Sequence, residues 1–442
     1  MFIKNVKKLM LCFFSMFMTS SIFAENNSVN IAISHWQLKN KTAVYFVQRK
    51  ELPMLDIAVL FKAGSVYDEK LPGLSSLTNE MIGEGAKNLS ANKIAELFEG
   101  VGAQFDANSN RDMAVVHLRT MTQKPMLDDA LKTFQTVLDQ PTFPITALQR
   151  IKKQALTSLA LEDQNPWNVA KNEFYKELYR SFPYAHNPLG DKDSINKISR
   201  NDILEFYQRY YTGKNARVII VGDISQNQAK DISQEIVGKL PPGISAPTLK
   251  LPKSQLLSAQ KHVIKQTHQA TIVLGQIGIS PDNAQYFPLL VGNAILGGLP
   301  LTSILYQQIR DEKGLAYFAN SSFEPLEYRG TFMIGLQTKA SNQSAVISLL
   351  NHILKTFIKD GPTDAQLSAA KKNLIGRFPL SIASNESIMR VLTKIVFYNY
   401  PSNYLDTYKT NVNAVTADDI KVAFQKTINP EKLTYVTVGP KN

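Results

Sequence analysis

The feature that most constrains the fold of this chain is an internal repeat. Residues 198–222 resemble residues 415–439 without a gap, and equivalent positions are 217 residues apart (439 − 222) throughout. Each copy predicts a polar N-cap, an amphipathic helix, a short loop, an edge strand and a glycine. The spacing is much longer than that of a solenoid repeat. It therefore predicts two homologous domains of about 200 residues each.

The boundary between the two domains is predicted near the middle of the chain. Residues 240–254 are rich in proline and serine, which is typical of an extended linker. We therefore predict an N-terminal domain over residues 25–240, a linker over 241–262 and a C-terminal domain over 263–442. Because each half mixes strands with runs of helices, the predicted fold class is α+β.

Local patterns place individual elements in these domains. Runs rich in Val, Ile, Phe and Tyr predict strands, and helical periodicity with an N-cap at Ser90 predicts helices. The predicted strands are 43–48, 56–62, 103–109, 113–121 and 217–221, and the first two helices are 74–84 and 90–101. Long helical stretches follow between residues 126 and 211, and four prolines in this region divide them.

The first 24 residues have the pattern of a secretory signal peptide. Lys4, Lys7 and Lys8 form a basic start, an apolar run follows, and Ala24 precedes a polar segment. The alternative is an uncleaved anchor, but the apolar run is shorter than the ~20 residues of a spanning helix. We expect export without a stable membrane span, into the periplasm or out of the cell. Since the only cysteine, Cys12, lies in this segment, the mature chain can form neither a disulfide nor a thiolate metal site.

The charge and the histidines exclude two further classes of function. The formal net charge is +12 at pH 7, but the lysines are scattered and form no stripe with aromatic residues, so we expect no nucleic acid partner. No two histidines have the spacing that places two zinc ligands on one helix. The histidines are His35, His117, His186, His262, His268 and His352. His186 lies in a proline-rich loop and is interpreted as a structural residue.

Two segments together resemble the insulinase/pitrilysin family of zinc peptidases. Residues 61–86 are similar to the strand, Gly-Ser turn and zinc helix of that family, and residues 297–317 are similar to its C-terminal substrate-binding segment. The resemblance implies two related α+β domains that face each other across a chamber, as in a clamshell. It also implies a peptide substrate and a zinc ion, which the family binds with an inverted His-x-x-Glu-His motif.

The zinc motif is degenerate in this chain. The matching positions are Ser76, Asn79 and Glu80. A hydroxyl is a poor zinc ligand, and an amide cannot act as the general base, which contributes about 10²- to 10⁴-fold in rate. The third ligand of the family, a glutamate, would fall near residues 157–158, and the next carboxylate is Glu162. We therefore predict that this chain holds no metal.

The C-terminal element that resembles the family is intact. It predicts a helix that begins near Thr302 and ends at Arg310, a turn, and a strand that carries Tyr317. In the family, an arginine and a tyrosine at this spacing hold the substrate backbone and stabilise the tetrahedral intermediate, since both donate hydrogen bonds to oxygen. The alternative is that Arg310 pairs with Asp311 or Glu312 and that Tyr317 packs in a core.

Three functions follow as hypotheses. The first is a zinc-less subunit that supplies Arg310 and Tyr317 to a homologous zinc-bearing partner, so that the two chains hydrolyse peptides together. The second is a non-enzymatic peptide-binding or structural pseudopeptidase. The third, which the scattered ligands disfavour, is a working protease with an unconventional metal site.

Overall fold

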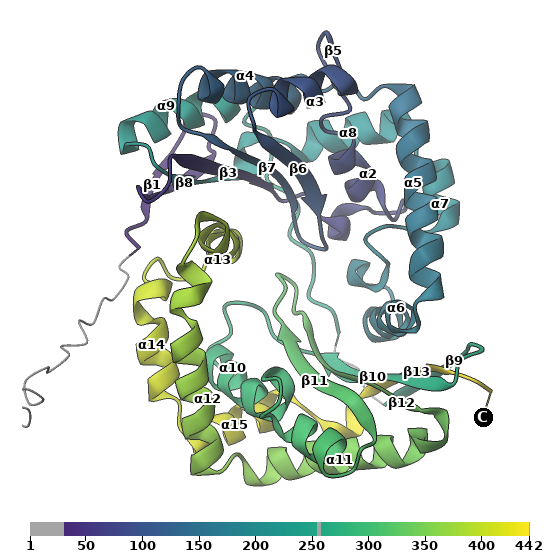
Figure 1. The fold of residues 1–442 in the computed structure, drawn as a ribbon. Helices are drawn as coiled ribbons and strands as arrows, with labels where there is room; N and C mark the ends of the chain where they lie inside the picture. The colour runs from purple at the N-terminus through teal and green to yellow at the C-terminus, as the bar shows by residue number, and fades with distance from the viewer. Residues whose placement is uncertain (1–30, 254–257, 442) are drawn as a thin grey trace, which may run out of the picture. The chain divides into compact units, whose positions relative to one another are not determined.

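The computed structural model describes residues 31–253 and 258–441. Every element below lies in the compact unit Ala32–Asn442. The predicted signal peptide, residues 1–24 with Cys12, lies outside the described residues. Two β-sheets, one in each half of the sequence, organise this unit (Figure 1).

The N-terminal half forms a six-stranded sheet in the order β1-β2-β8-β3-β7-β6. Helices α3, α4 and α9 lie along one side of this sheet (Figure 1). The strands are β1 (Ser34–Gln37), β2 (Ala43–Gln48), β3 (Met54–Phe61), β6 (Gln104–Ser109), β7 (Ala114–Met121) and β8 (Ala216–Gly222), and a small separate hairpin is β4 (Gly85–Ala86) and β5 (Leu89–Ser90). The helices are α2 (Leu74–Glu80), α3 (Ala91–Glu99), α4 (Met126–Asp139), α5 (Ile145–Gln164), α6 (Pro166–Tyr179), α7 (Lys192–Lys197), α8 (Arg200–Tyr210) and α9 (Gln226–Val237).

The C-terminal half forms a five-stranded sheet in the order β11-β12-β10-β13-β9. The strands are β9 (Ala259–Ile264), β10 (Gln269–Ile277), β11 (Ala316–Glu324), β12 (Thr331–Lys339) and β13 (Thr434–Gly439). The helices are α10 (Tyr286–Asn293), α11 (Gln343–Asp360), α12 (Asp364–Arg377), α13 (Asn385–Phe397), α14 (Tyr404–Ala414) and α15 (Ala417–Thr427), with π-helical segments at Ala294–Gly298 and Tyr306–Asp311. The α+β fold class is therefore confirmed.

The two sheets share one topology, which confirms the duplication inferred from the repeat. The order β2-β8-β3-β7-β6 matches the order β9-β13-β10-β12-β11 strand for strand. In each sheet the first two of these strands pair parallel, and the remaining neighbours pair antiparallel. The repeated helices α8 and α15 both begin with a capping box, formed by Ser199 and Asp202 in one and by Thr416 and Asp419 in the other.

The prediction that each repeat ends in an edge strand is wrong. β8 lies between β2 and β3, and β13 lies between β10 and β9. β8 is apolar except at Arg217, which is typical of an interior strand, because an edge or one-sided strand would alternate with polar residues. β13 carries Thr434 and Thr437, and all six of its residues are buried as well.

Local predictions in the N-terminal half are largely confirmed. β2 has the predicted bounds, and the hydroxyl of Ser90 caps α3 by accepting a hydrogen bond from the backbone N–H of Lys93. The helix predicted over 74–84 is shorter, because α2 ends at Glu80 and Gly83 adopts a φ of +96°. Glycine populates this left-handed region at little cost, so the chain turns there before β4.

One helix of each half packs on the sheet of the other half. α6 of the N-terminal half packs on β13 and β10, and α13 of the C-terminal half packs on β8 and β3 (Figure 1). The close approach of α6 depends on two glycines of this sheet: a Cβ at Gly275 of β10 would lie 3.0 Å from the Phe174 ring, and a Cβ at Gly335 of β12 would lie 2.1 Å from the Trp167 ring. Each helix therefore covers the sheet of the other half, and together they form part of the wall between the halves.

The segment predicted as a linker is bound to the N-terminal half. The backbone N–H groups of Gly213 and Lys214 donate to the carbonyls of Pro241 and Pro242, and Asn215 bonds the backbone of Ile244. These contacts hold the extended segment against the start of β8. The strand β9 begins at Ala259, inside the range predicted for the linker.

A buried carboxylate, Asp112, joins the two halves. It follows β6 in the turn toward β7, and its side chain is 0% exposed. It accepts hydrogen bonds from the Tyr184 hydroxyl, from the Tyr398 hydroxyl at 2.8 Å and from the backbone N–H of Glu327 at 3.0 Å. Two of these three donors belong to the C-terminal half, so Asp112 orients one half relative to the other.

The raised pKa of Asp112 predicts that the unfolding free energy of the protein falls as the pH rises. Burial raises the pKa of Asp112 from 3.8 to about 6. The folded state binds this proton more tightly than the unfolded state, so its contribution to stability is complete below about pH 4 and is lost as the pH passes about 6. Relative to the variant Asp112→Asn, which cannot titrate, we expect the native chain to lose about 2 kcal/mol of unfolding free energy between about pH 4 and pH 7. Urea denaturation of both proteins at several pH values measures this, and parallel pH profiles would contradict it.

Candidate functional site

The helix that matches the zinc helix begins after a rigid turn. Gly73 adopts a φ of +94°, and a Cβ there would lie 2.8 Å from the Leu189 carbonyl, so the position requires glycine. The buried carboxylate of Asp68 accepts hydrogen bonds from the backbone N–H groups of Gly73 and Ser75, each at 2.7 Å. His186 lies 3.3 Å from the same carboxylate and 3.0 Å from the Ser65 carbonyl. The structural role predicted for His186 agrees with these contacts.

The three degenerate positions of the motif contact one another or the core. The Ser76 hydroxyl donates to the Glu80 carboxylate at 3.1 Å. Asn79 is only 1% exposed, and both polar atoms of its amide are hydrogen-bonded: the Tyr211 hydroxyl donates to Oδ1 at 2.9 Å, and Nδ2 donates to the Val115 carbonyl at 3.2 Å. The position that would hold the general base is therefore a structural amide. Burial raises the pKa of Glu80, and the hydrogen bond from Ser76 opposes that shift.

The carboxylate nearest to the third ligand position does not join this group. Glu162 accepts hydrogen bonds from Asn187 at 2.7 Å and from Asn172 at 3.4 Å. Glu162 and Glu80 line different cavities. Across residues 31–253 and 258–441 no group of three or more His, Cys, Asp or Glu side chains could hold a metal ion.

Arg310 and Tyr317 lie together at the surface of the C-terminal half. The guanidinium carbon of Arg310 lies 5.0 Å from the centre of the Tyr317 ring and 4.6 Å from the centre of the Tyr306 ring. Such cation–π contacts hold the guanidinium in place without neutralising its charge. Tyr317 is 81% exposed, so the alternative in which it packs in a core is wrong. Arg310 has no carboxylate within ion-pair distance among the described residues.

The local backbone explains why this pair is exposed. Tyr306–Asp311 forms a π-helical turn instead of the end of a regular α-helix, and Gly314 turns the chain with a φ of +59°. β11 then begins as an edge strand whose pairing with β12 is irregular between Ala316 and Ala319. The irregularity frees Tyr317 from the ladder. π-helical turns and bulges of this kind are frequent at functional sites.

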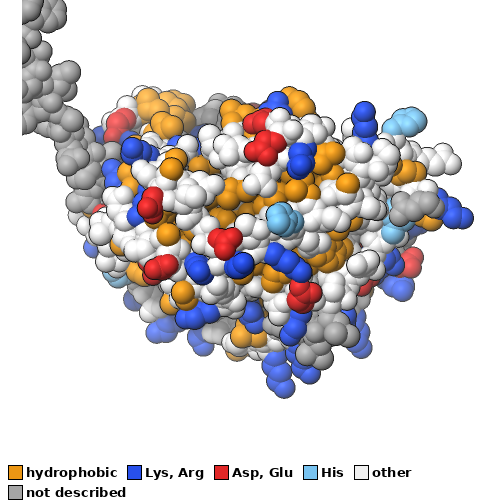
Figure 2. Space-filling view, turned by 90° about the horizontal axis from the view of Figure 1, so that it is seen from below, with side chains coloured by type: hydrophobic (Ala, Val, Ile, Leu, Met, Phe, Trp, Pro, Cys, Tyr) orange, Lys and Arg blue, Asp and Glu red, His pale blue; other side chains and the backbone are white. Residues whose placement is uncertain are grey.

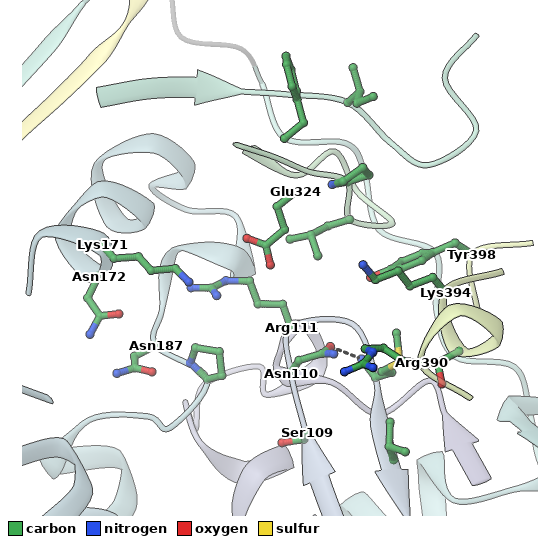
Figure 3. A pocket seen from close by; sticks show the side chains of 18 of the residues that line it. Ser109, Asn110, Arg111, Lys171, Asn172, Asn187, Glu324, Arg390, Lys394 and Tyr398 are labelled. Atoms are coloured by element: carbon green, nitrogen blue, oxygen red, sulfur yellow. Dashed lines mark hydrogen bonds between the residues drawn. The ribbon is translucent and has the colours of Figure 1, made fainter. Parts of the chain in front are cut away.

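A cavity lies between the two halves and does not include the predicted pair. Its volume is about 870 Å³, within the range of ligand-binding pockets. Its walls come from the β6–β7 turn, from α6, from α10, from the end of β11 and from α13. Figure 3 shows Arg111 at the centre of this pocket, with Lys171, Asn172 and Asn187 on one side and Arg390, Lys394 and Tyr398 on the other.

The polar residues of this cavity were missed by the sequence analysis. Arg111, Lys171, Arg390 and Lys394 come from three separate segments, and no motif links them. Arg111 lies between the predicted strands 103–109 and 113–121, and its position there does not indicate a binding role. The repeat predicts two homologous domains, but it covers only residues 198–222 and 415–439, so it does not reach α6 or α13, which carry Lys171 and Lys394. The packing of each helix on the sheet of the other half brings these side chains to one cavity.

The face of the molecule seen in Figure 2 shows no single charged patch. On the face seen in Figure 2, Lys and Arg side chains are dispersed, with Asp and Glu side chains and hydrophobic groups between them. This agrees with the scattered lysines of the sequence. Among the described residues, none of the helices has the length and apolar character required to cross a membrane.

Comparison with known proteins gives consistent matches along the chain. The family model described as Insulinase (Peptidase family M16) matches residues 45–192, and the one described as Peptidase M16 inactive domain matches residues 197–374. The chain is 27% identical over 416 residues to the Non-peptidase homolog YmxG of Helicobacter pylori, with 93% of this chain and 95% of the relative covered. It is 23% identical over 407 residues to the Zinc protease PqqE of the same bacterium, with 87% of this chain and 86% of the relative covered. A solved structure of a peptidase M16 inactive domain from Pseudomonas fluorescens superposes with a TM-score of 0.90 at 35% identity, covering 93% of this chain and 99% of that chain.

Proposed function

Because the chain belongs to the insulinase family, peptidase family M16, we propose that it is the zinc-less, substrate-binding subunit of a two-chain peptidase. A homologous partner binds the zinc and activates water, and this chain supplies Arg310 and Tyr317 to the substrate. One contrast carries the proposal. The base position is occupied by the buried amide of Asn79, whereas Arg310 and Tyr317 are held together and accessible.

The chemistry of the exposed pair fits this role. A guanidinium and a phenol both donate hydrogen bonds, and each can donate to the carbonyl oxygen of a peptide or to the oxyanion that forms when water attacks it. Tyr306 lies under the Arg310 guanidinium and fixes its position. A donor that is positioned in advance stabilises the transition state more than a mobile one, because no reorganisation is needed during the reaction.

The relatives favour a partner of the same family. Helicobacter pylori has one relative named a non-peptidase homolog and another named a zinc protease, and each matches more than four fifths of this chain. We propose that this chain likewise pairs with a zinc-bearing homologue. The predicted signal peptide adds the proposal that the complex works outside the cytoplasm, in the periplasm or in the medium.

Reconstitution tests the proposal. The purified mature chain should contain much less than one zinc per molecule and should not cut peptides, whereas mixing it with its zinc-bearing homologue should produce peptidase activity that neither protein has alone. Metal analysis and a quenched fluorescent peptide library measure the two quantities. Stoichiometric zinc in the isolated chain, together with peptide hydrolysis by it, would overturn the proposal.

A second candidate function is a non-enzymatic peptide binder. The observation in its favour is that the cavity between the halves is built entirely from this chain. This candidate predicts peptide binding by the chain and no hydrolysis in any combination with a homologue. The reconstitution experiment therefore separates the two functions.

A further inference from the structure

The cavity between the two halves has an excess of positive charge. Arg111, Lys171, Arg390 and Lys394 line it, against the two carboxylates of Glu162 and Glu324. Each carboxylate accepts hydrogen bonds from neutral donors: Glu162 from two asparagines, and Glu324 from the Tyr175 hydroxyl at 2.9 Å. Neither carboxylate lies within 4.0 Å of a basic side chain among the described residues.

The cations are consequently available to a ligand. Arg111, Lys171 and Lys394 form no ion pair with any carboxylate in residues 31–253 and 258–441, and Arg390 only approaches Glu386, at 4.0 Å. Arg111 and Lys171 are half-buried, whereas Arg390 and Lys394 are exposed at the rim. The two half-buried cations attract anionic groups the more strongly, because the low-dielectric walls of a cavity weaken screening by solvent.

Arg111 is positioned for this purpose. Its guanidinium carbon lies 3.6 Å from the centre of the Tyr175 ring, and its Nε donates to the Tyr184 carbonyl at 3.2 Å. These two contacts fix the plane of the guanidinium and leave its two terminal nitrogens for a ligand. A planar guanidinium can donate two parallel hydrogen bonds to a carboxylate.

The remaining polar walls are suited to a peptide backbone. Asn110, Asn168, Asn172 and Asn187 line the cavity. The Nδ2 atoms of Asn172 and Asn187 donate to Glu162, and the Oδ1 atoms of Asn110 and Asn187 accept backbone N–H groups. An amide can both donate and accept, as peptide groups do, so the Oδ1 of Asn172 and the Nδ2 of Asn110 can still pair with a peptide. A second cavity of about 490 Å³ shares Arg390 and Lys394 with the first and is lined by several aromatic rings. The aromatic lining comes from Tyr286, Phe378, Tyr400, Tyr404 and Tyr408. A ligand that spans both cavities therefore has anionic groups, amide groups and apolar side chains.

We propose that the cavity between the halves binds peptides that carry acidic residues, and that Arg111, Lys171, Arg390 and Lys394 select the carboxylates. This inference rests on the proposed function, because it names the class of peptide that the subunit selects. The cavity residues are different from Arg310 and Tyr317, so the proposed function and this inference can be tested separately.

Peptide binding to the purified mature chain tests the inference. The probe is a fluorescein-labelled decapeptide with two glutamates and one phenylalanine, and the comparison peptide has glutamine at both glutamate positions. Fluorescence anisotropy should show that the acidic peptide binds about tenfold more tightly, which corresponds to roughly 1.4 kcal/mol. The difference should decrease as salt is added, because the ion pairs are partly screened.

Two variants with the same change in charge locate the effect. Lys171→Gln combined with Lys394→Gln should abolish most of the preference, since neither side chain has a structural partner in the described residues. Lys132→Gln combined with Lys230→Gln removes two exposed lysines outside the cavity and should leave the preference unchanged. Equal binding of the two peptides, a preference that survives the cavity variant, or an equal loss in the surface variant would overturn the inference. These binding results would leave the proposed function untouched, because that function is tested by the peptidase activity of the reconstituted complex and by Arg310.

Discussion

Replacing Arg310 with alanine is expected to reduce the peptidase activity of the reconstituted two-chain complex by about 10²- to 10³-fold, the effect of removing one positioned oxyanion donor. The guanidinium is held between the rings of Tyr306 and Tyr317, so no neighbouring group is placed to take over its role. The loss should appear mainly in kcat, because the interaction strengthens as charge develops on the substrate oxygen. Steady-state kinetics of the complex measure both constants.

Two further variants serve as comparisons for Arg310→Ala. Tyr317→Phe keeps the ring beside Arg310 and removes only the hydroxyl, so it should cause a smaller loss than Arg310→Ala. Lys313→Ala removes an exposed cation from the same turn and should leave the activity near that of the native complex. If Arg310→Ala leaves the complex fully active, the division of labour between the two chains is falsified.

Restoring the general base at the degenerate motif is expected to destabilise the protein. Asn79→Glu should lower the unfolding free energy by about 3 kcal/mol, because a carboxylate would be buried without a compensating cation. The Val115 carbonyl now accepts a hydrogen bond from the Asn79 amide and would instead face a second acceptor. The Tyr211 hydroxyl could still donate to the new side chain, and one such bond does not offset the burial of a charge.

Urea denaturation at several pH values tests this expectation. The cost should be largest at neutral pH, should shrink as the pH falls toward about 4.3, and should lose its electrostatic part below that pH, where glutamate is protonated even in the unfolded chain. A purely steric defect would not depend on pH. Asn92→Glu makes the same chemical change at an exposed position of α3 and should alter stability by less than about 0.5 kcal/mol. An Asn79→Glu variant as stable as the native chain would show that this position remains ready for catalysis.

This consequence separates the chain from a peptidase that has lost only its ligands. The three motif positions of α2 are not an empty metal site, because the side chains of Ser76, Asn79 and Glu80 already have partners in the protein. Ser76 bonds Glu80, and Asn79 links α2 to β7 and to Tyr211. A return to metal chemistry would therefore require changes in the supporting residues as well as in the motif.

The sequence alone determined the duplication, the fold class and the loss of the zinc motif. These features can be found in the sequence without a structure. They are a repeat at fixed spacing, capping residues such as Ser199 and Thr416, and the residue types at Ser76 and Asn79. The bounds of β2 and the N-cap at Ser90 were predicted for the same reason, because apolar alternation and capping depend on neighbouring residues. The export of the chain and its partner remain predictions, since they depend on molecules other than this one.

Only the tertiary structure decided which distant side chains meet. The packing of α6 and α13 on the sheet of the other half brings Lys171 and Lys394 to one cavity, although they lie more than two hundred residues apart. The interior position of β8 and β13 likewise depends on which strands pair on either side of them, and no local pattern encodes those pairs. Contacts between remote segments arise from the packing of whole helices against sheets, so they become visible only when the chain has folded.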